Sequence, residues 1–303
     1  MRVFVTGATG FVGTAVVQEL LGAGHQVLGL ARSDASAQTL AATGAEVYRG
    51  TLENIDSLRQ GAAGADGVIH TAFIHDFSNM AASSEVDKRA IEAIGAELAG
   101  SSRPFVVTSA IGLLTPGRVG TEEDAPDSKS GGAYRAASEV AALSLASRGV
   151  RVSVVRLPPS VHGVGDYGFV PTLIRVAREK GVSAYLGEGR HRWAAVHKLD
   201  AAQLYRLALE KGEAGSTFHA IADEGVPTRD LAEVIGRRLG VPVVSKPPGE
   251  AAGHFGWLAK FFALDLPASS TRTQAQLGWR PRHPGLLADL EQGHYFASPK
   301  GAS

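Results

Sequence analysis

The residues best placed to bind a ligand lie near the N-terminus, where three glycines are spaced across a turn. An apolar run leads into Thr6–Gly13, and apolar residues at helical spacing follow over 15–21. A strand therefore runs into a turn that opens a helix, which is the context of a dinucleotide fingerprint. Gly7 permits the tight turn, Gly10 lets the backbone approach a pyrophosphate, and Gly13 allows close packing of helix on strand. The helix N-terminus offers free N–H groups to the phosphates.

The end of the second predicted strand carries a basic residue where a dinucleotide's ribose would lie. A NAD site usually has an acidic residue there, holding the ribose 2′-hydroxyl. Here the strand ends in Ala31, Arg32 and Ser33, and the first carboxylate is Asp34, which can point elsewhere. A guanidinium offers a fixed charge and a bidentate fork to a 2′-phosphate. We therefore predict NADP(H) in preference to NAD(H), with a solvated surface arginine as the alternative.

Apolar runs alternate with helical patterns through the first half of the chain. The predicted strands after the first are Val27–Leu30, Ala45–Tyr48, Gly67–His70, Phe105–Thr108 and Val152–Arg156. The predicted helices between them are Ser36–Thr43, Ile55–Ala62, Glu85–Gly100 and Arg135–Arg148. This alternation predicts an α/β fold, a Rossmann-type doubly wound parallel sheet with helices on both faces.

After Pro158 the elements become shorter and prolines more frequent, which predicts a smaller C-terminal substrate domain. Helices are predicted at Val170–Lys180, Ala201–Glu210 and Thr228–Leu239, and strands at Ala194–His197 and Thr217–His219, both returning to the large sheet. We assign 1–157, with about 194–222 returning, to the dinucleotide-binding domain. The substrate-binding domain then takes 158–193 and 223–303.

Composition narrows the classes of protein. The chain has 303 residues, 44% hydrophobic and 20% charged, as expected of a globular protein with a large core. Thirty basic residues balance thirty acidic ones, so we expect neither a nucleic-acid nor a membrane partner. The first residues already read as a strand, so we expect no secretory signal. The absence of cysteine excludes thiolate chemistry and fits the reducing cytoplasm.

Several motifs together resemble the extended branch of the short-chain dehydrogenase/reductase superfamily, the epimerase/dehydratase-like proteins. The matching segments are Thr6–Gly13, Val68–Ala72, Val106–Ser109, Val154–Pro158, Val161–Gly163 and Ala195–His197 with Asp200. The resemblance covers almost the whole chain. It implies a cofactor site made of Gly7, Thr9, Gly10, Phe11, Val12, Gly13, Arg32, Ser33, Thr51, Leu52, Thr71, Ala72, Phe73, Arg135 and Pro158. Thr51-Leu52 stands where the family usually has Asp-Leu beside the adenine.

The catalytic positions depart from the family pattern. The family uses a Ser, an Asn and a Tyr-x-x-x-Lys pair, in which the tyrosine transfers the proton and the lysine lowers its pKa. Tyr134 is the tyrosine of this region, but Ser138 stands at the lysine position. Ser109 resembles the family serine with a small shift, and Asp87 stands in place of the asparagine. These departures resemble an atypical subgroup that keeps the glycine motif and loses the catalytic tetrad.

A second alignment of the same helix is open. The family often has a glutamate one turn after the lysine, and Glu139 then assigns the lysine position to Arg135 and the tyrosine position to Gly131. The distance onward to Arg156 favours this alignment. An arginine can hold the ribose but does not titrate usefully. Tyr134 would then be a neighbour that can still reach the pocket.

Further side chains follow the predicted strands, where ligands bind in such sheets. His75 follows the fourth strand, and His162 and Tyr167 follow the sixth, so we name these three as substrate-site candidates, against the alternative that they are ordinary loop residues. The aromatic run 254–262 either lines an apolar pocket or builds the small domain's core, and we favour the core. No metal-ligand spacing is found, so we predict no metal site.

These observations predict an NADP(H)-dependent oxidoreductase acting on a small-molecule carbonyl or alcohol. Tyr134 would donate the proton, Ser109 polarise the carbonyl, Arg135 support the ribose or phosphate, and Asp87 order the network. The alternatives are a sugar-nucleotide epimerase or dehydratase and a non-catalytic NADP-binding sensor. The resemblance also implies a homodimer through the helices near Glu85–Gly100 and Arg135–Arg148.

Overall fold

The computed structural model describes residues 1–76, 79–130 and 132–297, and its centre is a seven-stranded parallel sheet. The strand order is β10-β6-β5-β4-β1-β2-β3, and every neighbouring pair is parallel. The strands are β1 (Arg2–Thr6), β2 (Gln26–Ala31), β3 (Glu46–Arg49), β4 (Gly67–His70), β5 (Pro104–Ala110), β6 (Arg151–Leu157) and β10 (Ser216–His219). The order reverses between β1 and β4, as in a doubly wound fold, so the predicted fold class is confirmed.

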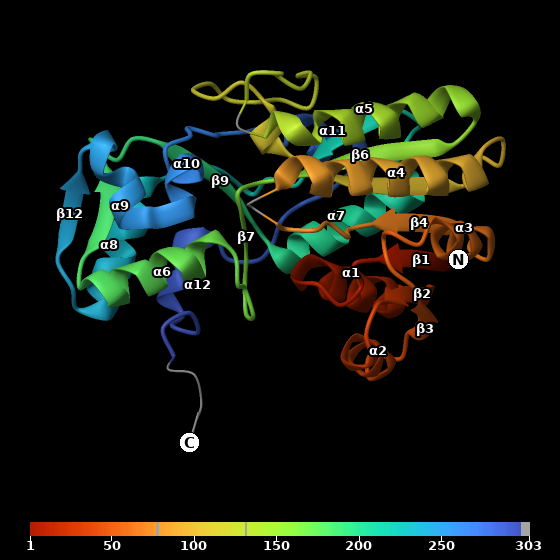
Figure 1. The fold of residues 1–303 in the computed structure, drawn as a ribbon, viewed down its shortest axis with the longest axis horizontal. Coiled ribbons are helices and arrows are strands. Elements are labelled where there is room, and N and C mark those ends of the chain that lie inside the picture. Colours follow the sequence, from red (N-terminus) through yellow and green to blue (C-terminus); the bar gives the residue numbers. More distant parts are fainter. Residues whose placement is uncertain (77–78, 131, 298–303) are drawn as a thin grey trace.

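Helices cover both faces of this sheet (Figure 1). One face carries α1 (Phe11–Gly22) and α7 (Lys198–Lys211), and the other carries α3 (Ile55–Ala63), α4 (Met80–Leu98) and α5 (Ala136–Ser144). Successive β1 residues serve opposite faces, because Val3 and Val5 pack with α1 and α7 whereas Phe4 packs with α3 and α4. The remaining helices of this part are α2 (Asp34–Ala41) and the 3₁₀ turns η1 (Ile111–Leu113), η2 (Ala133–Arg135) and η3 (Leu145–Arg148).

A second unit, at the left of Figure 1, has its own apolar core. Its strands are β7 (Ser160–His162), β8 (Ser183–Leu186), β9 (Arg192–His197), β11 (Asp223–Pro227) and β12 (Val243–Lys246), which form sheets in the orders β11-β9-β7 and β12-β8. Its helices are α6 (Phe169–Lys180), α8 (Thr228–Leu239), α9 (Ala251–Phe255), α10 (Ala259–Phe262) and α12 (Leu286–Glu291), with 3₁₀ turns η4 (Pro248–Glu250) and η5 (Gly256–Leu258). The helix α11 (Thr271–Leu277) instead packs against α7 and β10 of the large sheet. The predicted domain boundaries stay a prediction.

One of the two strands predicted to return to the large sheet does not do so. The strand at Thr217–His219 is β10 and pairs with β6, as expected. The strand at Ala194–His197 is β9, which pairs with β7 and β11. Ala194–His197 is buried on both faces, and such a short apolar run does not encode which strand it pairs with. None of the helices in the described part of the chain is both long and apolar enough to cross a membrane.

Candidate active site

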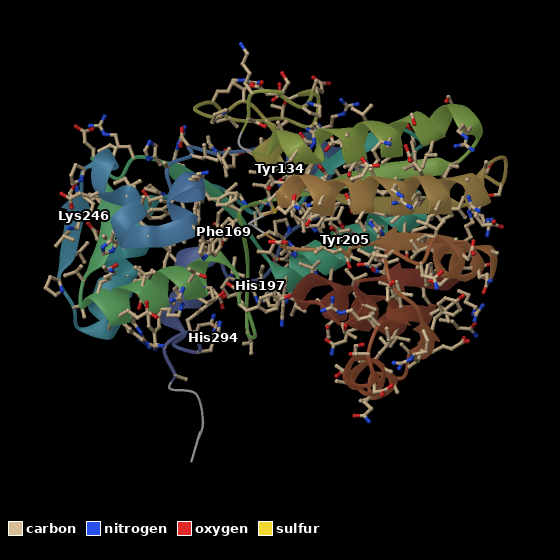
Figure 2. All side chains as sticks on the ribbon, viewed as in Figure 1. Tyr134, Phe169, His197, Tyr205, Lys246 and His294 are labelled. Carbon is tan, nitrogen blue, oxygen red and sulfur yellow. The ribbon has the colours of Figure 1, made fainter. Side chains whose placement is uncertain are left out.

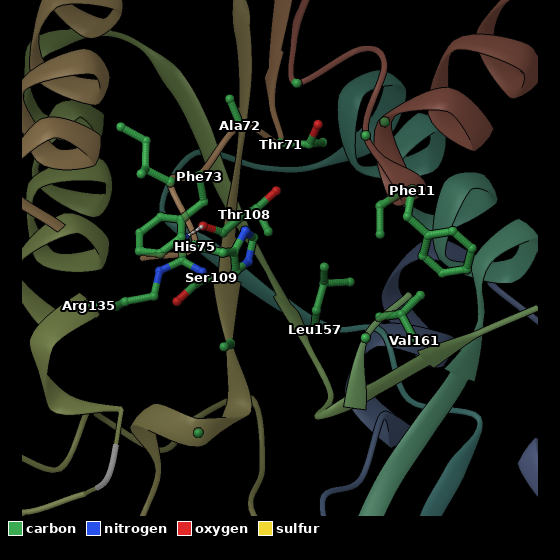
Figure 3. Close-up of a pocket in the computed structure, with 18 of the residues that line it drawn as sticks. Phe11, Thr71, Ala72, Phe73, His75, Thr108, Ser109, Arg135, Leu157 and Val161 are labelled. Carbon is green, nitrogen blue, oxygen red and sulfur yellow. Dashed lines mark hydrogen bonds between the residues drawn. The ribbon is translucent and has the colours of Figure 1, made fainter. Parts of the chain in front are cut away.

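A pocket of about 1040 Å³ opens at the carboxyl ends of the large sheet and extends to the second unit. It is lined by the β1–α1 turn, by residues after β2, β3, β4, β5 and β6, and by parts of α6, η5 and α10. Figure 3 shows Phe11 and Val161 on one side of it, and Phe73 and Arg135 on the other. This is the edge at which ligands bind in open parallel sheets.

The glycine turn is tight enough to exclude side chains. Gly7 has a φ of +67°, and a Cβ there would lie 2.6 Å from the backbone nitrogen of Ala72. A Cβ on Gly13 would lie 1.9 Å from the carbonyl oxygen of Gly7. Gly10 precedes α1 in extended conformation, and no side chain caps the helix. The first N–H groups of α1 are thus available to an anion, and Thr9, Phe11 and Val12 line the pocket beside them.

The residues predicted to bind the ribose and adenine lie at one end of the pocket. Arg32 is exposed and lines it, as do Thr51 and Leu52. Asp34 pairs with Arg49 of β3, so its carboxylate is occupied away from the turn. Ser33 is not among the lining residues, because its hydroxyl accepts a hydrogen bond from the backbone N–H of Ser36 and caps α2. The end of β2 therefore presents a cation and not a carboxylate.

The residues after β4 and β6 line the middle of the pocket. Thr71, Ala72, Phe73 and Pro158 all do so. The Thr71 hydroxyl donates to the carbonyl of Thr6 over 2.8 Å, which holds this segment against the glycine turn.

Ser109, Tyr134 and Arg135 meet at the same pocket. Ser109 lies on β5 with 3% of its surface exposed, and its hydroxyl has no hydrogen-bond partner within the described residues. Burial raises the pKa of the Tyr134 phenol, while the charge of Arg135 opposes that shift. The Arg135 guanidinium lies 4.0 Å from the centre of the Phe73 ring and donates to the carbonyl of Thr108 over 3.2 Å. Figure 3 shows Ser109 and Arg135 in one region of the pocket, and Tyr134 also belongs to the lining.

Asp87 does not line the pocket but belongs to a buried chain of polar side chains that reaches Arg135. Its Oδ2 lies 3.7 Å from Arg135 Nη2, and its Oδ1 is 3.1 Å from His70 Nε2. His70 Nδ1 is 2.8 Å from the Thr6 hydroxyl. The His70 and Asp87 side chains are both 1% exposed.

The donor between His70 and Asp87 can be assigned. Burial raises the pKa of the Asp87 carboxyl, but His70 and Arg135 outweigh it and leave the pKa below its usual value. The carboxylate accepts, so His70 donates from Nε2. Asp87 is thus a buried anion beside Arg135, and its ordering role stays a prediction. The motif around His70 was visible in the sequence, but nothing in the spacing showed that His70 holds Asp87.

The three substrate-site candidates are placed differently. His75 and Tyr167 line the pocket. Burial, with the charge of Arg135, lowers the pKa of His75. His162 is fully buried and does not line the pocket; its Nδ1 lies 2.8 Å from Asp289 of α12. The structure therefore places His162 inside the second unit.

Sequence reasoning missed Asp166, which lines the pocket in the loop before α6. It accepts hydrogen bonds from the N–H of Gly168 over 2.7 Å and from the hydroxyl of Tyr295 over 2.8 Å. Burial raises the pKa of this carboxyl, although both hydrogen bonds oppose the shift. Tyr295 is more than a hundred residues away in the chain, so no local signal could reveal the contact.

Tyr134 lies in η2, directly before α5, and α5 is fixed by Glu139, which forms a buried ion pair with Arg156 of β6. Arg135, at the start of this helix, points its guanidinium into the pocket region, as the second alignment requires. Gly131, the tyrosine position of that alignment, lies outside the described residues. The structure thus brings both Tyr134 and Arg135 to the site, and the choice of alignment stays a prediction. Among the described residues, no group of three or more His, Cys, Asp or Glu side chains is arranged to hold a metal ion.

Comparison with known proteins agrees with this geometry. A sequence model of the NAD dependent epimerase/dehydratase family matches residues 3–221. The chain belongs to this family. The resemblance drawn from the motifs is therefore confirmed, and the match extends from β1 past β10.

Two relatives of this family member differ in how similar they are to it and in whether their names give an activity. An uncharacterised protein of Schizosaccharomyces pombe is 51% identical over 298 residues, covering 98% of this chain and 100% of the relative. The 4-hydroxy-2-methyl-3-oxo-4-farnesyl-3,4-dihydroquinoline-1-oxide ketoreductase of Stigmatella aurantiaca is 29% identical over 272 residues, covering 84% of this chain and 80% of the relative.

The solved structures show the fold of this family member over its whole length. The dTDP-glucose 4,6-dehydratase of Streptomyces venezuelae, solved with NAD bound, has a TM-score of 0.78 at 19% identity. The similarity covers 98% of this chain and 97% of that chain. At this low sequence identity, the similarity shows that the fold is shared but does not show which reaction is catalysed.

Proposed function

We propose that the protein is an NADP(H)-dependent oxidoreductase that transfers hydride between a nicotinamide and a carbonyl or alcohol carbon. The observation that carries this proposal is that Ser109, Tyr134 and Arg135 all line the pocket that the glycine turn also lines. A family relative that is a ketoreductase supports the reaction class.

The cradle around Gly7 and Gly13 leaves no space for side chains, which fits close approach of a pyrophosphate. A nicotinamide dinucleotide bound there would supply or accept the hydride. The phosphates would lie on the N-terminus of α1, and Phe73 and Pro158 would flank the cofactor deeper in the pocket.

Each catalytic group has a stated task in reduction. The Ser109 hydroxyl donates a hydrogen bond to the carbonyl oxygen and makes the carbon more electrophilic. Tyr134 gives its proton to that oxygen, and its raised pKa keeps it protonated at neutral pH, as a donor must be. Arg135, oriented by Asp87, stabilises the phenolate that remains and supports the ribose.

Replacement of Tyr134 by phenylalanine tests the function. NADPH oxidation is followed against aldehydes, ketones and imines, and Tyr134→Phe should slow reduction by roughly 10²–10⁴-fold with NADPH affinity nearly unchanged. Tyr185→Phe, on β8 and away from the pocket lining, is the matched control. If Tyr134→Phe keeps most of its activity, the proton donor is not Tyr134 but His75, Tyr167, Asp76 or water. The absence of turnover with every carbonyl would favour the sensor.

Preference for NADP(H) is the second part of the proposal. Arg32 lines the pocket, and the nearest carboxylate, Asp34, is paired with Arg49. A charge-assisted contact to the 2′-phosphate should favour NADP over NAD by about 1–3 kcal/mol. Calorimetric titration of both cofactors measures this, and Arg32→Ala should remove the difference. Equal affinities in the unchanged protein would contradict the preference.

A sugar-nucleotide substrate has less support. A diphosphate would need basic side chains from the second unit, and four arginines there are not among the lining residues: Arg175, Arg178, Arg190 and Arg192. Three of them pair with carboxylates, and Arg178 donates to the carbonyl of Phe296. Conversion of UDP- or dTDP-glucose by the purified protein would select this alternative.

We further propose a homodimer through α4 and α5, in the reducing cytoplasm. Ala137 and Val140 are exposed on α5, and Val140 keeps 60% of its surface accessible. Leu145 does not belong to this interface, because it is buried against Gly95 of α4 in the same chain, where the glycine leaves room for its side chain. Light scattering at micromolar concentration should give the mass of a dimer, and Val140→Glu should give the monomer.

A further inference from the structure

Three aromatic side chains of the second unit form one wall of the pocket. They are Phe169 at the start of α6, Trp257 in η5 and Phe261 in α10. The Phe169 ring centre is 5.2 Å from that of Phe261 and 5.8 Å from that of Trp257, and Trp257 is 6.1 Å from Phe261. Figure 2 places Phe169 on the side of the second unit that faces the large sheet. We call Phe169, Trp257 and Phe261 the aromatic wall.

A second layer of rings fixes the aromatic wall from behind. Phe169 also packs on Trp193 at 5.5 Å, and Trp193 packs on Phe262 at 5.3 Å. Trp193 and Phe262 are 0% and 1% exposed. Rings held in this way keep their position without a ligand, so the wall is preorganised.

Trp257 is the part of the wall that has most to gain from a ligand. It keeps 43% of its surface exposed, whereas the other two tryptophans, Trp193 and Trp279, are fully buried. A partly exposed aromatic ring among the lining residues of a pocket is typical of a ligand contact. A ring stacked or set edge-on against it would gain both apolar burial and aromatic contact.

The pocket continues this apolar character beside the wall. Leu264 and Leu266 follow α10, and Leu113 and Met80 lie on the large-sheet side. The described charged residues of the lining are Arg32, Glu53, Asp76, Arg135 and Asp166, and none of them belongs to the aromatic wall. The region therefore favours a neutral, flat hydrocarbon group over a sugar or a phosphate.

From this geometry we propose that the aromatic wall selects the substrate, and that the substrate is a carbonyl compound with an aromatic ring on a short hydrocarbon stem. The inference deepens the proposed reductase activity and rests on it for the carbonyl. The carbonyl lies at Ser109 and Tyr134, and the ring contacts Trp257 and Phe261.

Tryptophan fluorescence tests the binding part without turnover. The probe is 3-phenylpropan-1-ol, an alcohol of the proposed product class, titrated into the protein saturated with NADP⁺. Emission should change saturably, because Trp257 is the exposed tryptophan, and glycerol should leave it unchanged. The change should disappear in Trp257→Phe, which keeps an aromatic ring, while calorimetry still detects the alcohol. A saturable change of equal size in Trp257→Phe would overturn the assignment.

Kinetics test the selection. We expect 3-phenylpropanal to be reduced with a higher kcat/KM than propanal, and Trp257→Ala and Phe261→Ala to lose roughly 10–100-fold on the first aldehyde and little on the second. Phe296→Leu, a half-buried aromatic position away from the pocket lining, is the matched control. Equal losses on both aldehydes would contradict selection by the wall. If the alcohol binds at Trp257 but no aldehyde is turned over, the reductase proposal is wrong and the binding role of the aromatic wall is kept. If aldehydes are turned over without preference for the ring, the role of the aromatic wall is wrong and the reductase proposal is kept.

Discussion

Two buried arginine–carboxylate pairs lie close to α5, and they differ in how completely their polar atoms are used. Arg156 Nε lies 3.2 and 3.1 Å from the two carboxylate oxygens of Glu139, and Nη2 lies 2.5 Å from Oε1. Arg135 approaches Asp87 only once, at 3.7 Å. Within the described residues, Arg135 Nε and Asp87 Oδ2 have no hydrogen-bond partner, whereas no side-chain atom of Arg156 or Glu139 lacks one.

Under the proposed function, this difference separates a structural pair from one that serves the reaction. Buried polar atoms are normally satisfied, so a saturated pair such as Arg156–Glu139 ties α5 to β6 and has nothing left to offer a ligand. The Arg135–Asp87 pair is longer and less completely bonded, and Arg135 lines the pocket. Incomplete polar satisfaction is typical of functional sites.

The largest effect is expected where the saturated pair is broken. Glu139→Gln leaves the Arg156 charge buried without its anion, and should lower the free energy of unfolding by about 3–5 kcal/mol. Urea denaturation measures it. Glu188→Gln, which breaks the exposed pair with Arg190, is the matched control and should leave stability nearly unchanged. Similar stabilities for both variants would remove the distinction between a buried and an exposed pair.

The unsaturated pair should respond in the opposite way. Arg135→Gln keeps a donor but loses the charge, so turnover of a carbonyl should fall by about 10²-fold. The loss of unfolding free energy should be clearly smaller than in Glu139→Gln, because the pair is single and long. Arg135→Lys, which restores the charge without the planar fork, should recover part of the turnover. Full turnover in Arg135→Gln with a stability loss like that of Glu139→Gln would make both pairs structural.

The parts of the fold that local sequence determines were predicted well. The strand at Gly67–His70 and the helix at Thr228–Leu239 have their predicted bounds, because periodicity and flanking turns are local signals. The partner of β9 was not predictable, because pairing between short apolar strands depends on residues far apart in the chain. The glycine turn was predictable, because all of its contacts lie within one strand-turn-helix unit or the neighbouring strand end.

The sequence predicted those parts of the candidate site that depend on residues close together in the chain. The side chains of Ser109, Tyr134 and Arg135 reach the pocket, but the link from His70 through Asp87 to Arg135 joins three separate elements. The aromatic run 254–262 divides between the core and the pocket. Phe255, Leu258 and Phe262 are buried in the core, as predicted for the run as a whole. Trp257 and Phe261 line the pocket, because the run is broken into α9, η5 and α10 and does not form one continuous helix.

Acid should separate the two pairs further, because different groups titrate beside them. His219 accepts at Nε2 from Arg156 Nη1 at 3.3 Å and donates from Nδ1 to the carbonyl of Ser269 at 2.9 Å. A second proton would point at the arginine, so burial and this charge lower the pKa of His219 from 6.5 to about 4. The unfolded chain then binds the proton first. Stability is fully present above pH 6.5 and falls as the pH drops from there toward 4.

Asp87 follows the same sign in a more acidic range. Its pKa lies below the usual 3.8, so its contribution is present above that pH and is lost only as the pH falls through the folded value. As the pH falls, the stability contributed around the Arg156–Glu139 pair should therefore be lost before that around the Arg135–Asp87 pair. Urea unfolding at pH 7 and pH 5 should show a loss of stability that is smaller by about 1–2 kcal/mol in His219→Asn than in the unchanged protein. The same loss in both proteins would mean that the proton is taken up elsewhere, and that acid does not distinguish the saturated pair from the pair at the pocket.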